Sequence, residues 1–124
     1  MKKRLMVVDD EPALTRMVKL NLEQTGRYEV RTENVGKSAL DAAREFRPEL
    51  VLLDVLMPGM LGSEIAARMQ EDPELRSIKI VFLTAVVTKQ EELKLEGRIG
   101  GYTLVAKPVG AEELCRVVAE ELGQ

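Results

Sequence analysis

The stretch ELVLLDVLMP, residues 49–58, decides the fold because it sets a carboxylate at the end of a segment built for burial. Leu50 to Leu53 are four consecutive apolar residues, the pattern of a parallel strand that is covered on both faces. Asp54 follows directly, and Pro58 and Gly59 then break the chain. An unpaired buried carboxylate is costly or takes up a proton. Asp54 therefore either caps the following turn or has partners elsewhere in the chain.

The composition describes a single globular domain, residues 1–124, without a surface for nucleic acid. A hydrophobic fraction of 45% supplies one core at this length, and a charged fraction of 31% is ordinary for a soluble chain. The net charge of −3 argues against a nucleic-acid partner, because phosphate backbones are bound by basic patches. No apolar run is long enough to span a bilayer and no signal-peptide pattern is present, so we expect no membrane partner and a cytoplasmic location. The chain has no His and one Cys, which excludes His-dependent triads, Cys/His metal sites and an internal disulfide.

Short apolar runs alternate with helix-length amphipathic stretches along the chain. The runs cover residues 4–10, 28–34, 49–54, 79–85 and 102–108. Helical spacing of apolar residues follows four of them, and a weaker stripe over residues 88–101 predicts a short helix after the fourth. The second run is the most polar and predicts an edge strand. Five strands that alternate with five helices predict an α/β fold with a parallel sheet.

Polar side chains stand at the ends of four of the five predicted strands. Asp9 and Asp10 end the first, Asp54 the third, Thr84 the fourth and Lys107 the fifth. Ligands of open α/β sheets bind at the carboxyl ends of the strands, so these side chains are expected to converge on one rim. The predicted edge strand offers nothing comparable.

The residue types at this rim favour metal-assisted phosphoryl chemistry. Three neighbouring carboxylates need a cation to stay ionised, and Mg²⁺ prefers oxygen ligands. Asp9, Asp10 and Asp54 therefore form a candidate Mg²⁺ site. Asp54 would attack a phosphoryl group, and Lys107 and Thr84 would meet its oxygens.

Each of these residues also has a plainer interpretation when it is taken alone. Asp9 and Asp10 serve equally well as caps of a helix near Pro12. Thr84 alone is an ordinary strand-end hydroxyl, and Lys107 alone a solvated charge. The conjunction at successive strand ends favours the phosphoryl site.

Four segments match a known family in their order and spacing. They are VVDDEP (7–12), LVLLDVLMPGMLG (50–62), VFLTA (81–85) and AKP (106–108). On these segments the chain resembles, over essentially its full length, the receiver domain of two-component response regulators. The resemblance implies a doubly wound, flavodoxin-like sheet of five parallel strands in the order 2-1-3-4-5. It also implies a signalling domain that catalyses only its own phosphorylation and dephosphorylation, and is not a turnover enzyme.

The resemblance implies a role for each rim residue. Asp54 would be the phosphoacceptor, supplied by a sensor histidine kinase, a phosphotransfer protein or a small acyl phosphate. The Mg²⁺ ligands would be Asp9, Asp10, Asp54 and the backbone carbonyl of Leu56. Thr84 would contact the phosphoryl group and Lys107 would pair with it, and the Lys107–Pro108 peptide would be cis.

The resemblance also implies a switch region, and here the sequence departs from the family. The region comprises Thr84, Ala85, Tyr102, Leu104 and Pro108. The family often has an aromatic residue three places before the lysine, where this chain has Leu104, with Tyr102 two residues earlier. Leu61 stands where an acidic residue is common, and residues 98–103 are also atypical.

Because of these departures we expect normal phosphorylation with altered transmission. Partner binding would change on the face formed by the fourth and fifth strands and the helices that follow them, through a surface that differs from that of the commonest relatives. The output would be a downstream protein or a detached output domain. A homodimer through the fourth and fifth helices stays an alternative.

The apolar residues Leu56 and Val86 predict a slow loss of the phosphoryl group. They lie two positions after Asp54 and Thr84, beside the path of an attacking water.

Two other function classes stay open. Mg²⁺-dependent phosphatases also use an Asp nucleophile after an apolar strand, but they need an acidic residue two places later, where this chain has Leu56. The second class is a receiver-like scaffold that binds partners without being phosphorylated. The complete set of acidic residues argues against this class, whereas the altered switch region keeps it open.

Overall fold

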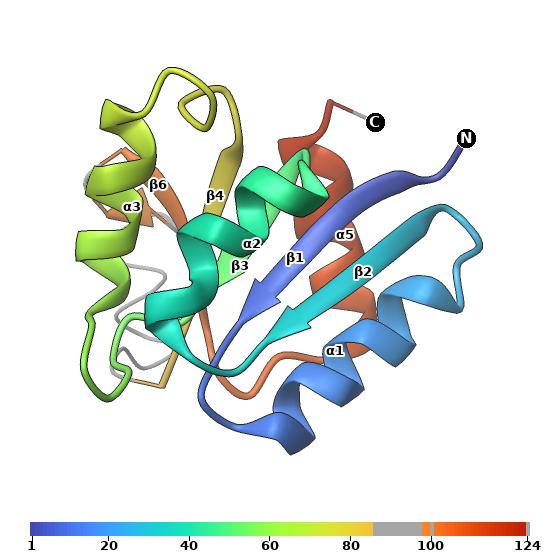
Figure 1. Cartoon of the computed structure of the whole chain (residues 1–124). Coiled ribbons are helices and arrows are strands. Elements are labelled where there is room, and N and C mark those ends of the chain that lie inside the picture. Colours follow the sequence, from blue (N-terminus) through green and yellow to red (C-terminus); the bar gives the residue numbers. More distant parts are fainter. Residues whose placement is uncertain (86–97, 100, 124) are drawn as a thin grey trace.

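Strands and helices alternate along the chain in the computed structural model, which describes residues 1–85, 98–99 and 101–123 (Figure 1). The strands are β1 (Lys3–Val8), β2 (Tyr28–Glu33), β3 (Leu50–Leu53), β4 (Lys79–Thr84), β5 (Arg98–Ile99) and β6 (Tyr102–Ala106). The helices are α1 (Pro12–Glu23), α2 (Ala39–Phe46), α3 (Gly62–Glu71) and α5 (Ala111–Glu121), with a 3₁₀ turn η1 (Gly36–Ser38) before α2.

The sheet has the order β2-β1-β3-β4-β6-β5. The first five strands of this order pair in parallel, which confirms the predicted 2-1-3-4-5 arrangement, with β6 as its fifth strand and β2 at the edge. Register places Val8 beside Leu53, and Leu53 beside Phe82. Because parallel strands end at the same edge, this register brings the residues after β1 and β3 to one rim.

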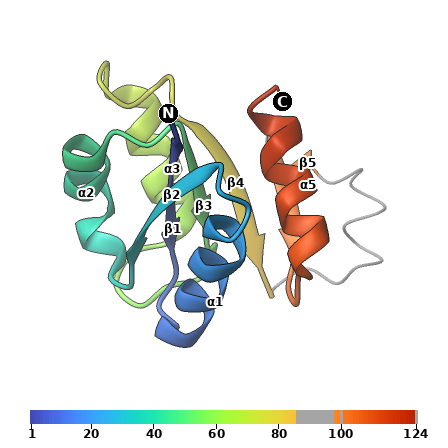
Figure 2. The same ribbon diagram turned by 90° about the vertical axis from the view of Figure 1, so that its right-hand side faces the viewer.

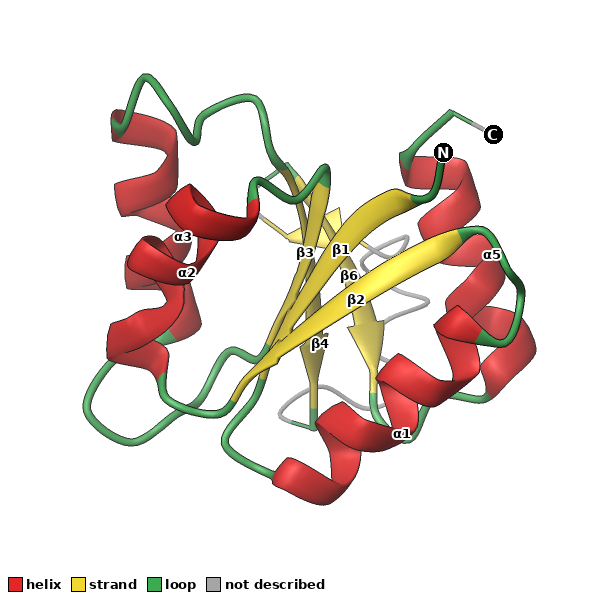
Figure 3. Cartoon of the chain, turned by 45° about the vertical axis from the view of Figure 1, so that its right-hand side comes forward, coloured by secondary structure: helices red, strands yellow, loops and turns green. Residues whose placement is uncertain are grey.

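Of the described helices, α2 and α3 cover one face of the sheet and α1 and α5 cover the other (Figure 3). Alternate residues of β1 point to opposite faces: Met6 and Val8 pack in the core under α2 and α3, and Leu5 and Val7 pack in the core under α1 and α5. The central strands are buried on both sides, which explains their continuous apolar runs. Among the described helices, none combines the length and the apolar character needed to cross a bilayer.

The strand β5 was not predicted. Residues 98 and 99 pair antiparallel with β6, Arg98 with Thr103 and Ile99 with Tyr102. Gly101 in the connection has a φ of 86°, a conformation that favours glycine. The predicted helix over 88–101 is therefore wrong at its end, because backbone pairing with β6 replaces the helical pattern there. Residues 88–97 and 100 lie outside the described part of the chain.

Figure 2 shows the start of β1 and the end of α5 at the same end of the sheet. The rim formed by the carboxyl ends of the strands lies at the opposite end (Figures 1 and 2).

Candidate functional site

Three carboxylates gather at the rim where β1 and β3 end. One oxygen each of Asp9, Asp10 and Asp54 lies within 4.8 Å of the other two. The backbone fixes this placement, since the Asp54 N–H donates to the Val8 carbonyl and the Asp9 N–H donates to the Glu33 carbonyl, both at 3.0 Å. Asp9 and Asp54 are buried, whereas Asp10 is exposed.

Lys107 reaches into this cluster from the end of β6. Its Nζ donates to Asp9 Oδ2 at 2.5 Å and lies 3.7 Å from Asp54 Oδ1. Its backbone N–H donates to the carbonyl of Thr84 at 2.8 Å, which ties the ends of β4 and β6 together. Thr84 is fully buried, and the Lys107–Pro108 peptide is cis. The structure thus brings the sequence-predicted carboxylates and Lys107 into one cluster, with Thr84 one hydrogen bond away.

The electrostatics of the cluster make the Asp54 carboxyl hold its proton more tightly than an ordinary aspartate does. Burial and the neighbouring Asp9 carboxylate raise the pKa of Asp54 to about 6, although Lys107 opposes the rise. Burial disfavours the Lys107 ammonium, but its hydrogen bond to Asp9 and its attraction to Asp54 outweigh burial and hold its pKa above the ordinary value. Positive charge brought to this rim therefore lowers the pKa of Asp54 and favours the ionised form that can act as a nucleophile.

Helix capping does not explain the two buried carboxylates. The N-caps of α1 and α3 are Glu11 and Leu61, and neither helix has a side-chain cap hydrogen bond. Asp9 Oδ1 accepts the N–H of Glu11 at 2.9 Å, which orders the loop before α1.

Gly62 lets α3 begin directly against the backbone of Asp54. A Cβ atom at this position would lie 2.0 Å from the Asp54 carbonyl oxygen and 3.0 Å from the Val55 Cα. The Gly62 N–H donates to the Val55 carbonyl at 2.8 Å. The loop that follows Asp54 is thus closed by a contact that only glycine permits.

Comparison with known proteins assigns the chain to one family. The model of the response regulator receiver domain matches residues 5–119. The chain belongs to the response regulator receiver domain family. It is 33% identical over 124 residues to the polar-differentiation response regulator DivK of Brucella anthropi, covering 99% of this chain and 98% of that protein.

Solved receiver structures superpose on nearly the whole chain. The chemotaxis protein CheY4 of Vibrio cholerae is 26% identical with a TM-score of 0.82, over 98% of this chain and 99% of that one. The BeF3-activated receiver domain of DrrB is 28% identical with a TM-score of 0.79, over the full length of both chains.

The donor set of this receiver fits the Mg²⁺ that is typical of the family. All three side chains are carboxylates, and their oxygens are close enough to share one ion. Mg²⁺ takes oxygen ligands and usually keeps several waters, so the exposed Asp10 and the buried Asp54 can serve together.

Two apolar side chains of the loop that follows Asp54 are exposed to solvent. Leu56 and Leu61 are 55% and 41% exposed, and both belong to the loop between β3 and α3. Val86, the other apolar residue predicted to shield the site, lies outside the described residues.

The switch residues differ in burial: Thr84 and Leu104 are buried, Tyr102 is half-buried, and Ala85 and Pro108 are exposed. Leu104 is buried beside its register partner Phe82. Tyr102 is half-buried and meets the Phe82 ring edge-to-face, with 5.4 Å between centroids and 88° between planes. Phe82 lies on the same face of β4 as Thr84, since the two are two residues apart. An aromatic pair therefore stands next to Thr84. Its tyrosine, Tyr102, lies two residues earlier on β6 than the position at which the family often has an aromatic residue.

Sequence reasoning missed Asn34, which follows the edge strand. Its Nδ2 donates to the Asp9 carbonyl at 2.9 Å and to Thr15 Oγ1 at 3.0 Å. The expectation that β2 offers nothing to the rim was wrong, because its contribution is made to the backbone of Asp9. The available signal was the polar amide of Asn34 at the end of β2, the one remaining parallel strand, which lies beside β1.

Proposed function

We propose that this receiver domain is switched by phosphorylation of Asp54. The donor would be a sensor histidine kinase, a phosphotransfer protein or a small acyl phosphate. The observation that carries the proposal is a buried Asp54 carboxylate with Asp9 and Asp10 beside it and the Lys107 ammonium 3.7 Å away.

In the transfer, an Asp54 oxygen forms a bond to phosphorus while the bond from phosphorus to the donor atom breaks. The leaving imidazole nitrogen or carboxylate oxygen keeps the electron pair of that bond. Lys107 lies where it would neutralise charge on the phosphoryl oxygens, and the Thr84 hydroxyl would donate to one of them. Asp9, Asp10, Asp54 and the Leu56 carbonyl would hold Mg²⁺, which adds positive charge at the same oxygens.

The outcome of the reaction would be a change of partner binding and not a released product. Thr84, the Phe82–Tyr102 pair and the neighbouring Ala85, Leu104 and Pro108 would carry the change to the face that includes β4, β6 and α5. A downstream protein or a detached output domain in the cytoplasm would read it, or a second copy of the chain would bind there.

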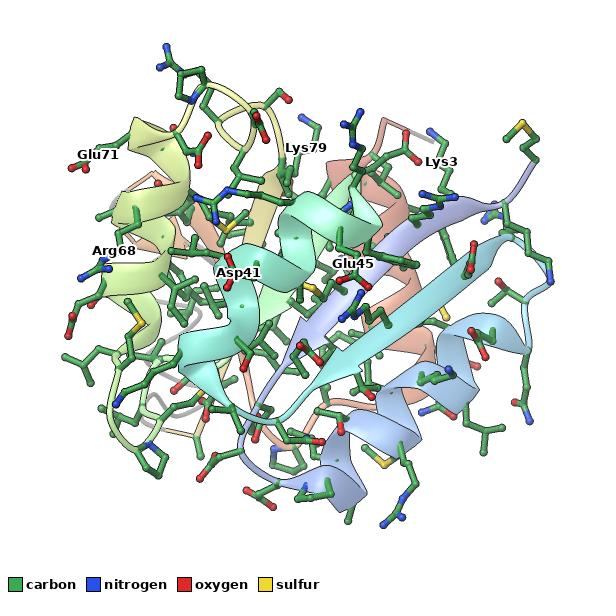
Figure 4. The ribbon with its side chains drawn as sticks, viewed as in Figure 1. Lys3, Asp41, Glu45, Arg68, Glu71 and Lys79 are labelled. Atoms are coloured by element: carbon green, nitrogen blue, oxygen red, sulfur yellow. The ribbon has the colours of Figure 1, made fainter. Side chains whose placement is uncertain are left out.

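Intact-mass measurement after incubation with acetyl phosphate tests the proposal. We expect a gain of one phosphoryl group that requires Mg²⁺, is lost with chelator and is absent in Asp54→Asn. Asp41→Asn is the matched control, because Asp41 is an exposed carboxylate on α2, remote from the rim (Figure 4). Absence of any gain would favour the unphosphorylated scaffold, and turnover of an added phosphate ester would favour a phosphatase.

A further inference from the structure

Asn34 and Thr15 form a hydrogen-bonded chain across the loop that carries Asp9 and Asp10. The Asn34 amide nitrogen donates to the Asp9 carbonyl and to Thr15 Oγ1, at 2.9 and 3.0 Å. Thr15 Oγ1 in turn donates to the Pro12 carbonyl at 3.1 Å. These bonds connect Asp9, the first residue of the loop, to Pro12, the first residue of α1, and we call Asn34 and Thr15 the loop brace.

The brace is protected from water and has only one workable arrangement. Thr15 is 1% exposed and Asn34 is half-buried. The Asp9 carbonyl can only accept a hydrogen bond, so the NH₂ group of the Asn34 amide must face it and Thr15 Oγ1. Thr15 Oγ1 then accepts from Asn34, and its own hydrogen is left to donate to the Pro12 carbonyl. Such a chain holds the loop more firmly than an exposed hydrogen bond would, since water competes with it less.

Asp10 depends on this brace more than the other two carboxylates. The Asp9 side chain is held by the Glu11 N–H and by Lys107, and Asp54 is buried in the cluster. Within the described residues, no hydrogen bond holds the exposed Asp10 carboxylate. Its direction is set by the peptide between Asp9 and Asp10, and the carbonyl of that peptide is the group that Asn34 holds.

We propose that Asn34, acting through Thr15 and the Asp9–Asp10 peptide, is a positioning residue for the Mg²⁺ site. The inference rests on the proposed function, because it assigns Asn34 a role only if this rim binds the ion. Groups that orient metal ligands without touching the metal commonly change its affinity about 10-fold or more. Loss of the brace would free Asp10 to leave the position in which it shares an ion with Asp54.

A Mg²⁺ titration followed by amide chemical shifts of the folded protein tests the brace without any phosphoryl donor. We expect Asn34→Ala to raise the Mg²⁺ dissociation constant about 10-fold. Thr15→Val removes the hydroxyl at nearly constant shape and should raise the constant in the same direction. Thr15→Ser keeps the hydroxyl and should bind close to wild type.

Thr25→Ala is the matched control for general loss of stability. The Thr25 hydroxyl also makes two local hydrogen bonds between α1 and β2: it donates to the Leu22 carbonyl in α1 and accepts from the N–H of Arg27, the residue before β2. These bonds lie at the opposite end of the two elements from the loop brace. Thr25→Ala should lower stability and leave Mg²⁺ affinity unchanged.

Three results would overturn the inference, and they are distinguishable. Wild-type affinity in a folded Asn34→Ala variant would exclude the positioning role alone. An equal loss in Thr25→Ala would assign the effect to stability. No Mg²⁺ binding by the wild type would overturn the proposed function together with the brace.

Discussion

Replacing Asp54 with Asn should stabilise the metal-free protein at neutral pH. The pKa of Asp54 rises from 3.8 to about 6 on folding, chiefly through burial and repulsion by Asp9. A carboxyl with a raised pKa binds a proton more tightly in the folded state, so its ionisation costs stability as pH rises through the window from 4 to 6. The full cost above that window corresponds to about 3 kcal/mol, and solvent at the rim reduces it to about 1–2 kcal/mol.

Urea denaturation in chelator at several pH values measures this gain. The free energy of unfolding of Asp54→Asn minus that of the wild type should be smallest near pH 4, grow through pH 6 and level off at about 1–2 kcal/mol by pH 7. Asp41→Asn should show no such pH dependence, because Asp41 is exposed and away from the cluster. Added Mg²⁺ should reverse the order, since the ion binds the folded wild type and stabilises it by mass action. A neutral or destabilising Asp54→Asn substitution at pH 7 in chelator would refute the electrostatic reasoning.

Three further substitutions test separate parts of the site. Gly62→Ala should destabilise the protein by about 2 kcal/mol or more, measured by urea denaturation, because its Cβ would meet the Asp54 carbonyl at 2.0 Å; unchanged stability would contradict the close approach. Leu56→Asn should shorten the lifetime of the phosphorylated protein, because a polar side chain at this position can guide water to the phosphoryl group. The lifetime is measured by intact mass after the phosphoryl donor is removed. An unchanged lifetime would count against shielding by Leu56. Tyr102→Leu should lower the free energy of unfolding by about 0.5–1.5 kcal/mol, because the edge-to-face pair with Phe82 is lost. It should also reduce the change in the Thr84 amide chemical shift on phosphorylation. A chemical-shift change of wild-type size would exclude Tyr102 from the switch.

The sequence was sufficient for the parallel sheet and for the main rim residues. Continuous apolar runs mark strands that are buried on both faces, and a polar residue at the end of each run is carried to the rim by the topology alone. Asp9, Asp54 and Lys107 could therefore be predicted to meet before any distance was known.

Features that depend on tertiary contacts could not be predicted in this way. The strand β5 is two residues long, and its pairing with β6 outweighs the weak helical stripe that precedes it. The need for Gly62 arises from the approach of α3 to the Asp54 backbone, and the role of Asn34 arises from its reach to a neighbouring strand's carbonyl. Neither leaves a periodic pattern in the sequence.

The central claim is that Asp54 itself carries the phosphoryl group. Borohydride reduction of the phosphorylated protein, followed by peptide sequencing by mass spectrometry, converts an acyl phosphate into an alcohol at the modified residue and so locates it. We predict reduction at Asp54 alone, in an amount that matches the phosphoryl group seen by intact mass. Reduction at Asp9 or Asp10, or the same yield in Asp54→Asn, would contradict the claim.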